Sequence, residues 1–139
     1  AHGRGKYTKL DGHSYEGNWY RNSKSGHGVE SWPDGTLYDG EFQESCKHGT
    51  GIYKSGNGVV YKGQFKNDHM DGEGSYSFSD GRTYVGQWSS GSMHGKGLLT
   101  WTNGATYTGE FAMGSKEGEG TFVSADGRSY QGQWKAGKQ

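Results

Sequence analysis

The sequence predicts an all-β fold: an elongated, single-layer, twisted antiparallel sheet of six stacked β-hairpins, with about twelve strands. Three observations support this prediction. Glycine accounts for 28 of the 139 residues, and each interior glycine would cost a helix about 1 kcal/mol relative to alanine. Glycines and aromatic residues recur every 23 residues without an insertion or deletion. An Asp-Gly or Asn-Gly dipeptide, the strongest short-range hairpin signal, occurs once in each repeat.

The second strand of each hairpin carries the motif Tyr-x-Gly-x-(Trp/Phe), which places all three residues on one face because strand side chains alternate. Its copies form the structural repeat: Tyr15, Gly17, Trp19, Tyr38, Gly40, Phe42, Tyr61, Gly63, Phe65, Tyr84, Gly86, Trp88, Tyr107, Gly109, Phe111, Tyr130, Gly132 and Trp134. The residues between them are mostly polar, so the opposite face is expected to meet water.

The small glycine between two rings leaves a gap in the aromatic face of the predicted sheet. A ring from the neighbouring strand can cover such a gap. The candidates, each two residues after a Gly-x-Gly pair, are Tyr7, Tyr53, Tyr76, Leu99 and Phe122. Glu30 breaks this pattern in the second repeat.

A Gly-x-Gly pair marks the start of the first strand of each hairpin and sets the predicted boundaries. The whole chain, 1–139, is one array whose hairpin units are 2–20, 25–43, 48–66, 71–89, 94–112 and 117–135, joined by four-residue links. Both edges of the array are expected to stay open for pairing, and we expect the chain to be a fragment of a longer array.

Composition excludes several classes of partner. The 15 basic and 15 acidic residues balance, so the chain lacks the clustered positive charge that nucleic acids and anionic membranes require. No nucleic-acid partner is expected, and direct binding to membrane lipid is expected to be weak or absent. The single cysteine cannot form an internal disulfide, and no apolar run approaches the roughly 20 residues of a membrane span. We therefore expect a cytoplasmic protein.

The repeat resembles the MORN repeat, the membrane occupation and recognition nexus. The segment from Tyr84-Val85-Gly86-Gln87-Trp88 through His94-Gly95-Lys96-Gly97 is a close match, and the resemblance covers nearly the entire chain. It implies a MORN-repeat solenoid that acts as a non-enzymatic scaffold. Among relatives, the chain is most similar to cytoskeletal proteins of protist parasites that consist almost wholly of MORN repeats.

The family resemblance also implies a set of partners and a location. Such arrays self-associate, often as antiparallel dimers, so the implied partners are a second copy and a cytoskeletal or other protein, with a cytoskeleton-associated location. Two alternatives stay open. The module could bind phosphoinositides at a membrane surface, or it could target an enzyme domain that is not part of this sequence.

No catalytic motif stands out, so no catalytic residue is predicted. The sequence has no nucleophile elbow or Walker loop, and its Gly-x-Gly pairs recur at strand starts without the helix that a phosphate site needs.

A zinc site shared between two chains is a further hypothesis, with Cys46, His48 and His69 as its ligands. Cys46 and His48 lie in one link, and His69 occupies the position of Cys46 one repeat later. Because one link supplies too few ligands for a closed tetrahedral site, a second chain would have to complete it. The alternative is a solvated thiol with surface imidazoles, and no other cofactor is expected.

Three rings are candidate contacts for a protein partner: Trp32, Phe78 and Trp101. They occupy one column of the repeat, where other copies have lysine or serine, so the fold does not require them. Aromatic residues are enriched at interface cores. The alternative is that these rings only fill gaps in the sheet. A choline-binding hairpin solenoid is a more distant alternative, because its repeats lack the Gly-x-Gly pair.

Overall fold

The computed structural model describes residues 3–135, and the chain divides into two units, residues 1–69 and 70–139. The first unit contains β1 (Gly3–Thr8), β2 (Ser14–Tyr20), β3 (Ser23–Ser31), β4 (Leu37–Gln43), β5 (Cys46–Lys54) and β6 (Val60–Lys66). The second contains β7 (His69–Ser77), which begins at the boundary, β8 (Thr83–Ser89), β9 (Ser92–Thr100), β10 (Thr106–Ala112), β11 (Ser115–Val123) and β12 (Ser129–Trp134). No helix occurs within residues 3–135.

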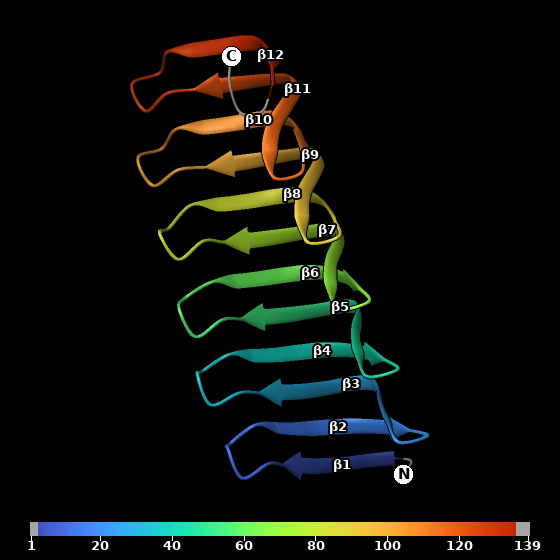
Figure 1. The fold of residues 1–139 in the computed structure, drawn as a ribbon. Helices are drawn as coiled ribbons and strands as arrows, with labels where there is room; N and C mark the ends of the chain where they lie inside the picture. Colours follow the sequence, from blue (N-terminus) through green and yellow to red (C-terminus); the bar gives the residue numbers. More distant parts are fainter. Residues whose placement is uncertain (1–2, 136–139) are drawn as a thin grey trace. The chain divides into compact units, whose positions relative to one another are not determined.

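Within each unit, every strand pairs antiparallel with its neighbours in the sequence (Figure 1). The predicted all-β class, with twelve antiparallel strands, is therefore confirmed for the described part of the chain.

The Asx-Gly dipeptides close one end of the hairpins with a tight turn and a left-handed glycine. In the first hairpin, the N–H of Gly12 donates to the carbonyl of Lys9 at 3.0 Å, and Gly12 has φ of 99°. Asp11 Oδ1 accepts the N–H of His13 at 2.9 Å. The same contact occurs at Asp80, where the N–H of Arg82 holds the pKa of the carboxyl below its usual value. The turn signal in the sequence thus has a direct structural cause.

The connections between hairpins are shorter than the predicted four-residue links. β3 and β5 begin at Ser23 and Cys46, two residues before the predicted unit starts at 25 and 48. Only two residues remain in each connection, and all of these have positive φ: Arg21 and Asn22, Glu44 and Ser45, Asn67 and Asp68, Ser90 and Gly91, Met113 and Gly114. Two positive-φ residues match the right-handed twist of the flanking strands, so pairing continues up to the turn.

The first glycine of a Gly-x-Gly pair permits a bulge in the sheet at four positions: Gly26, Gly49, Gly95 and Gly118. Gly49 has φ of 75°, and the register between β4 and β5 shifts beside it, between Gly40 and Phe42. Glu41 fills the space that a Gly49 side chain would need, with Oε2 at 2.6 Å from the ideal Cβ position. The same Oε2 accepts the N–H of Thr50 at 2.7 Å. The bulge therefore requires both the glycine and a carboxylate or amide across from it.

The second glycine of each pair lies opposite the glycine of the tyrosine motif. Gly17 pairs with Gly28, and a Cβ on Gly28 would meet the Tyr15 ring at 2.6 Å. The Tyr15 hydroxyl donates to the carbonyl of Asn18 at 2.7 Å, which directs the ring along its own strand. The prediction that a ring from the neighbouring strand fills this gap is therefore wrong, because the register places Tyr53 opposite Tyr38 and Gly51 opposite Gly40.

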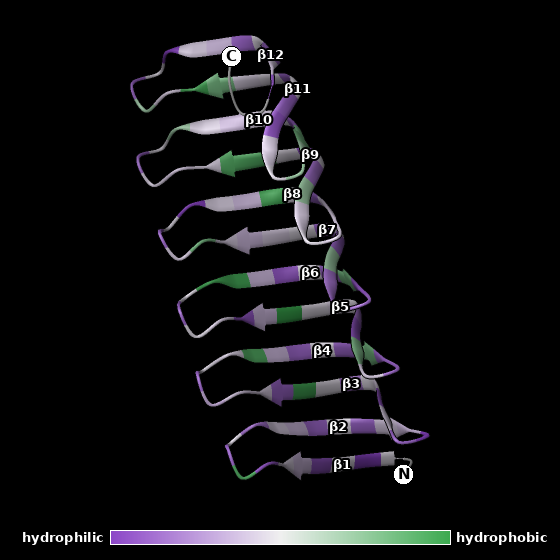
Figure 2. Cartoon of the chain, in the orientation of Figure 1, coloured by the Kyte–Doolittle hydropathy of each residue, from purple (hydrophilic) through white to green (hydrophobic). Residues whose placement is uncertain are grey.

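The tyrosine rings form the core, and they are buried by other rings. Five have no exposed surface: Tyr15, Tyr38, Tyr61, Tyr84 and Tyr107. Tyr38, for example, packs edge-on against Phe42 of its own repeat at 5.0 Å and against Phe65 of the next at 5.2 Å. Figure 2 shows how little of each ribbon is hydrophobic in colour. Aromatic contacts along the strand order thus take the place of an aliphatic core.

Replacing the second glycine tests this packing. We expect Gly28→Ala to lower the free energy of unfolding by about 3 kcal/mol, because its methyl group overlaps the Tyr15 ring. Gly5→Ala is the matched control, since its Cβ would meet the Trp19 ring at an ordinary 3.5 Å. It should stay within about 1 kcal/mol of the wild type. Urea unfolding followed by tryptophan fluorescence measures both, and equal losses would contradict the contact.

Candidate functional site: the aromatic face

Three lysines lie across the aromatic face, the face of each unit that carries the tyrosine motif. The Lys47 ammonium lies over the rings of Trp32, Tyr38 and Tyr53 at 5.7, 5.5 and 5.8 Å. Lys24 covers Tyr15 and Phe42 in the same way. Lys116 covers Trp101, Tyr107 and Trp134 at 5.0, 5.6 and 5.2 Å. Each long side chain buries its stem on the rings and places its charge over their faces.

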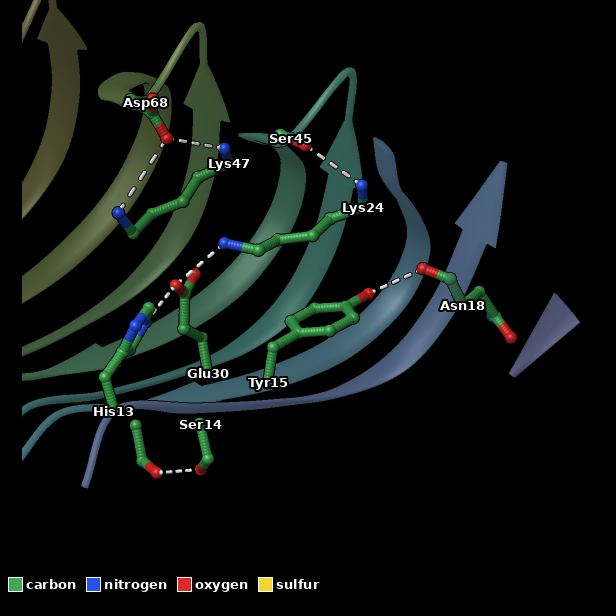
Figure 3. Close-up of polar contacts among 10 residues, drawn as sticks. His13, Ser14, Tyr15, Asn18, Lys24, Glu30, Ser45, Lys47 and Asp68 are labelled. Carbon is green, nitrogen blue, oxygen red and sulfur yellow. Dashed lines mark hydrogen bonds and ion pairs between the residues drawn. The ribbon is translucent and has the colours of Figure 1, made fainter. Parts of the chain in front are cut away.

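A buried ionic cluster replaces one ring of the face in the first unit. Glu30 is 5% exposed, and its Oε2 lies 2.8 Å from Lys24 Nζ and 2.5 Å from His13 Nε2 (Figure 3). The His13 ring stacks on Trp32 at 5.2 Å. Glu30 occupies the position of Tyr53 and Tyr76 in other repeats. The exception to the repeat pattern seen in the sequence is therefore a buried carboxylate that is paired with two basic side chains.

Burial also perturbs the core tyrosines. Removal from water raises the pKa of Tyr84 to about 12 and raises the pKa values of Tyr15, Tyr38 and Tyr107. Desolvation likewise lowers the pKa of Lys116, which lies on the rings. The neutral phenol is thus the favoured form in the folded chain.

The structure places Trp32, Phe78 and Trp101 on the aromatic face, each half-buried. Phe78 contacts Tyr76 at 4.6 Å, and Trp101 contacts Phe122 at 5.7 Å. Trp32 lines a hollow of about 260 Å³ with Asp34, Thr36, Lys47 and Tyr53, and Phe78 lines another of about 210 Å³. These rings therefore cover part of the aromatic face and leave part of their own surface exposed. Both roles considered from the sequence, contact with a protein partner and filling of gaps in the sheet, remain open.

The three predicted zinc ligands lie at strand starts but do not gather into a site within the chain. Cys46 begins β5, His48 is its third residue, and His69 begins β7. Among residues 3–135, no group of three or more His, Cys, Asp or Glu side chains could hold a metal. Burial and a hydrogen bond to Asp68 raise the pKa of the Cys46 thiol, which disfavours the thiolate that binds zinc. Zinc shared between two chains stays a prediction.

The opposite face of the second unit carries two exposed apolar side chains. Val85 pairs with Leu98, and they are 54% and 39% exposed. They border a shallow hollow of about 580 Å³ together with charged neighbours such as Lys96 and Glu119. The predicted polar character of this face therefore has an exception here.

The contacts of the lysines with the rings of the aromatic face were not predicted from the sequence. Their column reads Lys24, Lys47, Met70, Met93 and Lys116. All five side chains are long and unbranched, a signal that this position crosses an apolar surface rather than pointing into water. His13 was also missed, because its pairing with Glu30 joins residues of different repeats.

The fold and this face define a class of protein, a repetitive β-hairpin module whose rings pack from one repeat to the next. The MORN repeat family model matches residues 1–14, 15–37, 38–60, 61–81, 84–106, 107–127 and 130–139. The chain therefore belongs to the MORN repeat family, whose repeats are typical of modules that interact with membranes or proteins and have no enzymatic activity. A search of curated proteins found no match. Within residues 3–135, no helix has the length and hydrophobicity needed to cross a bilayer.

The MORN family model matches seven segments, whereas residues 3–135 form six hairpins. The numbers differ because a match and a hairpin begin at different positions of the repeat. Each full match begins at the tyrosine, which lies in the second strand of a hairpin. The first and last matches, 1–14 and 130–139, are consequently partial.

Removing Lys24 tests the buried cluster. We expect Lys24→Met to lower the free energy of unfolding by about 3 kcal/mol, because the Glu30 carboxylate then loses its ammonium partner. Adding Glu30→Tyr to this variant should recover most of the lost stability, since it recreates the methionine and tyrosine found at these positions in another repeat. Lys47→Met is the control, because Lys47 lies 3.8 Å from the half-exposed Asp68, and should cost less than about 1 kcal/mol. Urea unfolding measures all three, and no recovery in the double variant would contradict the assignment.

Alkaline pH should unfold the protein. The tyrosine pKa values are higher in the folded chain than their usual value of 10.0, so the folded state resists ionisation. The stabilising contribution of these tyrosines is complete below pH 10 and is lost as pH rises above 10. For Tyr84 the loss is about 1.4 kcal/mol per pH unit up to a pH of about 12. Urea midpoints between pH 8 and 12 should show this decline. Tyr84→Phe should make it shallower, and a flat profile would contradict it.

Proposed function

We propose that the chain is a non-enzymatic scaffold that binds a protein partner through its aromatic face, self-associates, and organises a cytoskeletal or membrane-associated assembly in the cytoplasm. One observation carries this proposal. Trp32, Phe78 and Trp101 stand in a column where other repeats have lysine or serine, yet they lie half-buried on the aromatic face. Rings that the fold does not require, on a surface without a second layer over it, are suited to hold a partner.

The position of the lysines weighs against phosphoinositide binding as the main activity. The ammonium groups of Lys24, Lys47 and Lys116 lie over rings, and Lys24 is also paired with Glu30. They would have to leave these contacts to meet a lipid phosphate. A polybasic stripe, in contrast, offers its charges to an anionic surface without such a cost.

Self-association is tested by the oligomeric state. We expect size exclusion with light scattering to show a dimer at tens of micromolar protein. Trp101→Ala should weaken the dimer at least about tenfold, as loss of an interface aromatic ring does, while the melting temperature changes little. Lys9→Ala, in the same column but exposed, is the control and should behave like the wild type. A wild type that is monomeric at all concentrations overturns self-association. Equal losses of association and thermal stability in Trp101→Ala assign its ring to packing.

A further inference from the structure

A cavity on the aromatic face of the second unit is lined by rings and thioethers. Its volume is about 210 Å³, and its lining is Met70, Tyr76, Phe78, Trp88, Gly91, Ser92, Met93 and Gly114. Tyr76 lies 4.6 Å from Phe78 at an interplanar angle of 63° and 5.4 Å from Trp88 at 41°. For comparison, an apolar cavity of roughly 150 Å³ is enough to hold benzene. The cavity thus has room for a small organic group among three rings.

Rings of this face already bind cations elsewhere in the chain. The ammonium groups of Lys47 and Lys116 each lie within 6 Å of three ring centroids. Each lysine comes from the column that contains Met70 and Met93 in the two repeats at the cavity. In those repeats the chain therefore does not supply the lysine that covers rings in the others. Arg82 lies over Phe78 at 4.4 Å, but it is paired with Asp80 at 2.9 Å and does not line the cavity.

The kind of cation follows from the absence of charge in the lining. The Lys24 ammonium has a carboxylate partner, Glu30 at 2.8 Å, and the Lys47 ammonium lies 3.8 Å from Asp68. None of the eight lining residues of the cavity is acidic. The Lys116 ammonium covers three rings with no carboxylate among its ion pairs in residues 3–135, so a primary ammonium over rings can rely on water for its N–H donors. A quaternary ammonium has no N–H donor to satisfy and can contact the lining on every side without water. Its charge is spread over methyl groups that can contact rings and thioethers.

We infer that this cavity binds a quaternary ammonium group, such as the trimethylammonium of choline. The inference goes beyond the scaffold function and does not rest on it: Phe78 serves in both proposals, but choline binding and self-association are measured separately. A loss of dimerisation would leave it intact, and a failure to bind choline would leave the scaffold proposal intact.

Calorimetric titration with choline chloride tests the site. We expect saturable binding, and at least about fivefold weaker binding of the neutral isostere 3,3-dimethylbutan-1-ol, because only the charged group gains the attraction of the ring faces. Phe78→Ala should weaken choline binding at least about fivefold. Tyr20→Ala, which removes an exposed ring outside the cavity, should leave it unchanged. No saturable binding of choline, or equal binding of the isostere, overturns the inference.

Filling the cavity with a lysine of the chain gives an independent test. Met93→Lys recreates the column residue of other repeats, so the variant should fold, which its melting temperature verifies. Its ammonium should occupy the rings and weaken choline binding at least about tenfold. Met93→Leu keeps the position apolar and should retain binding. If a folded Met93→Lys binds choline like the wild type, the inference is overturned.

Vesicle sedimentation identifies the source of the trimethylammonium group. If wild-type protein sediments with phosphatidylcholine vesicles and Phe78→Ala does not, the site takes a lipid headgroup. If choline binds in the titration and no sedimentation occurs, the site takes a soluble molecule. Sedimentation that Phe78→Ala leaves unchanged overturns the use of this cavity by a lipid.

Discussion

The structure depends on one close contact, in which a tyrosine ring occupies the space above two paired glycines. Any side chain at Gly28 would overlap the Tyr15 ring, and any side chain at Gly17 would meet the backbone of Gly28. The tyrosine hydroxyl satisfies its hydrogen bond on the strand that carries the ring, so the phenol can be fully buried. A sheet without a covering layer can bury large side chains only if its own backbone leaves room for them, and the glycine pairs provide this room.

This contact explains why the repeat tolerates so much change elsewhere. Within the two units, Tyr15, Tyr38, Tyr84 and Tyr107 each meet the Trp or Phe of their own repeat and that of the next, so packing depends on neighbouring repeats. Side chains at positions other than these tyrosine, glycine and Trp/Phe positions need only pack across the rings or fit a turn. Lysine, methionine and a buried carboxylate all occur at such positions without a change in strand register.

The sequence predicts those features whose cause lies within one repeat. The strand pattern, the hairpin turns and the aromatic face follow from residues that recur at fixed spacing. The two-residue connections were not predicted, because Asn22, Ser45 and Asp68 replace glycine there and hide the need for positive φ. The register of Gly17 with Gly28, and the pairing of Glu30 with His13, depend on which residues of adjacent strands face each other. The spacing within one strand does not determine this.

Stability and the proposed ligand binding use the same ring surfaces. A lysine at the repeat position of Lys24 and Lys116 places its ammonium over the rings. The rings then gain a cation–π contact, but less of their surface is accessible to a ligand. A methionine at that position packs against the rings without supplying a charge. The lysines lie over the Tyr15, Tyr38 and Tyr107 rings without displacing these rings from their paired glycines. The choice between lysine and methionine in one column can therefore decide where the aromatic face is open to a ligand, while the fold stays the same.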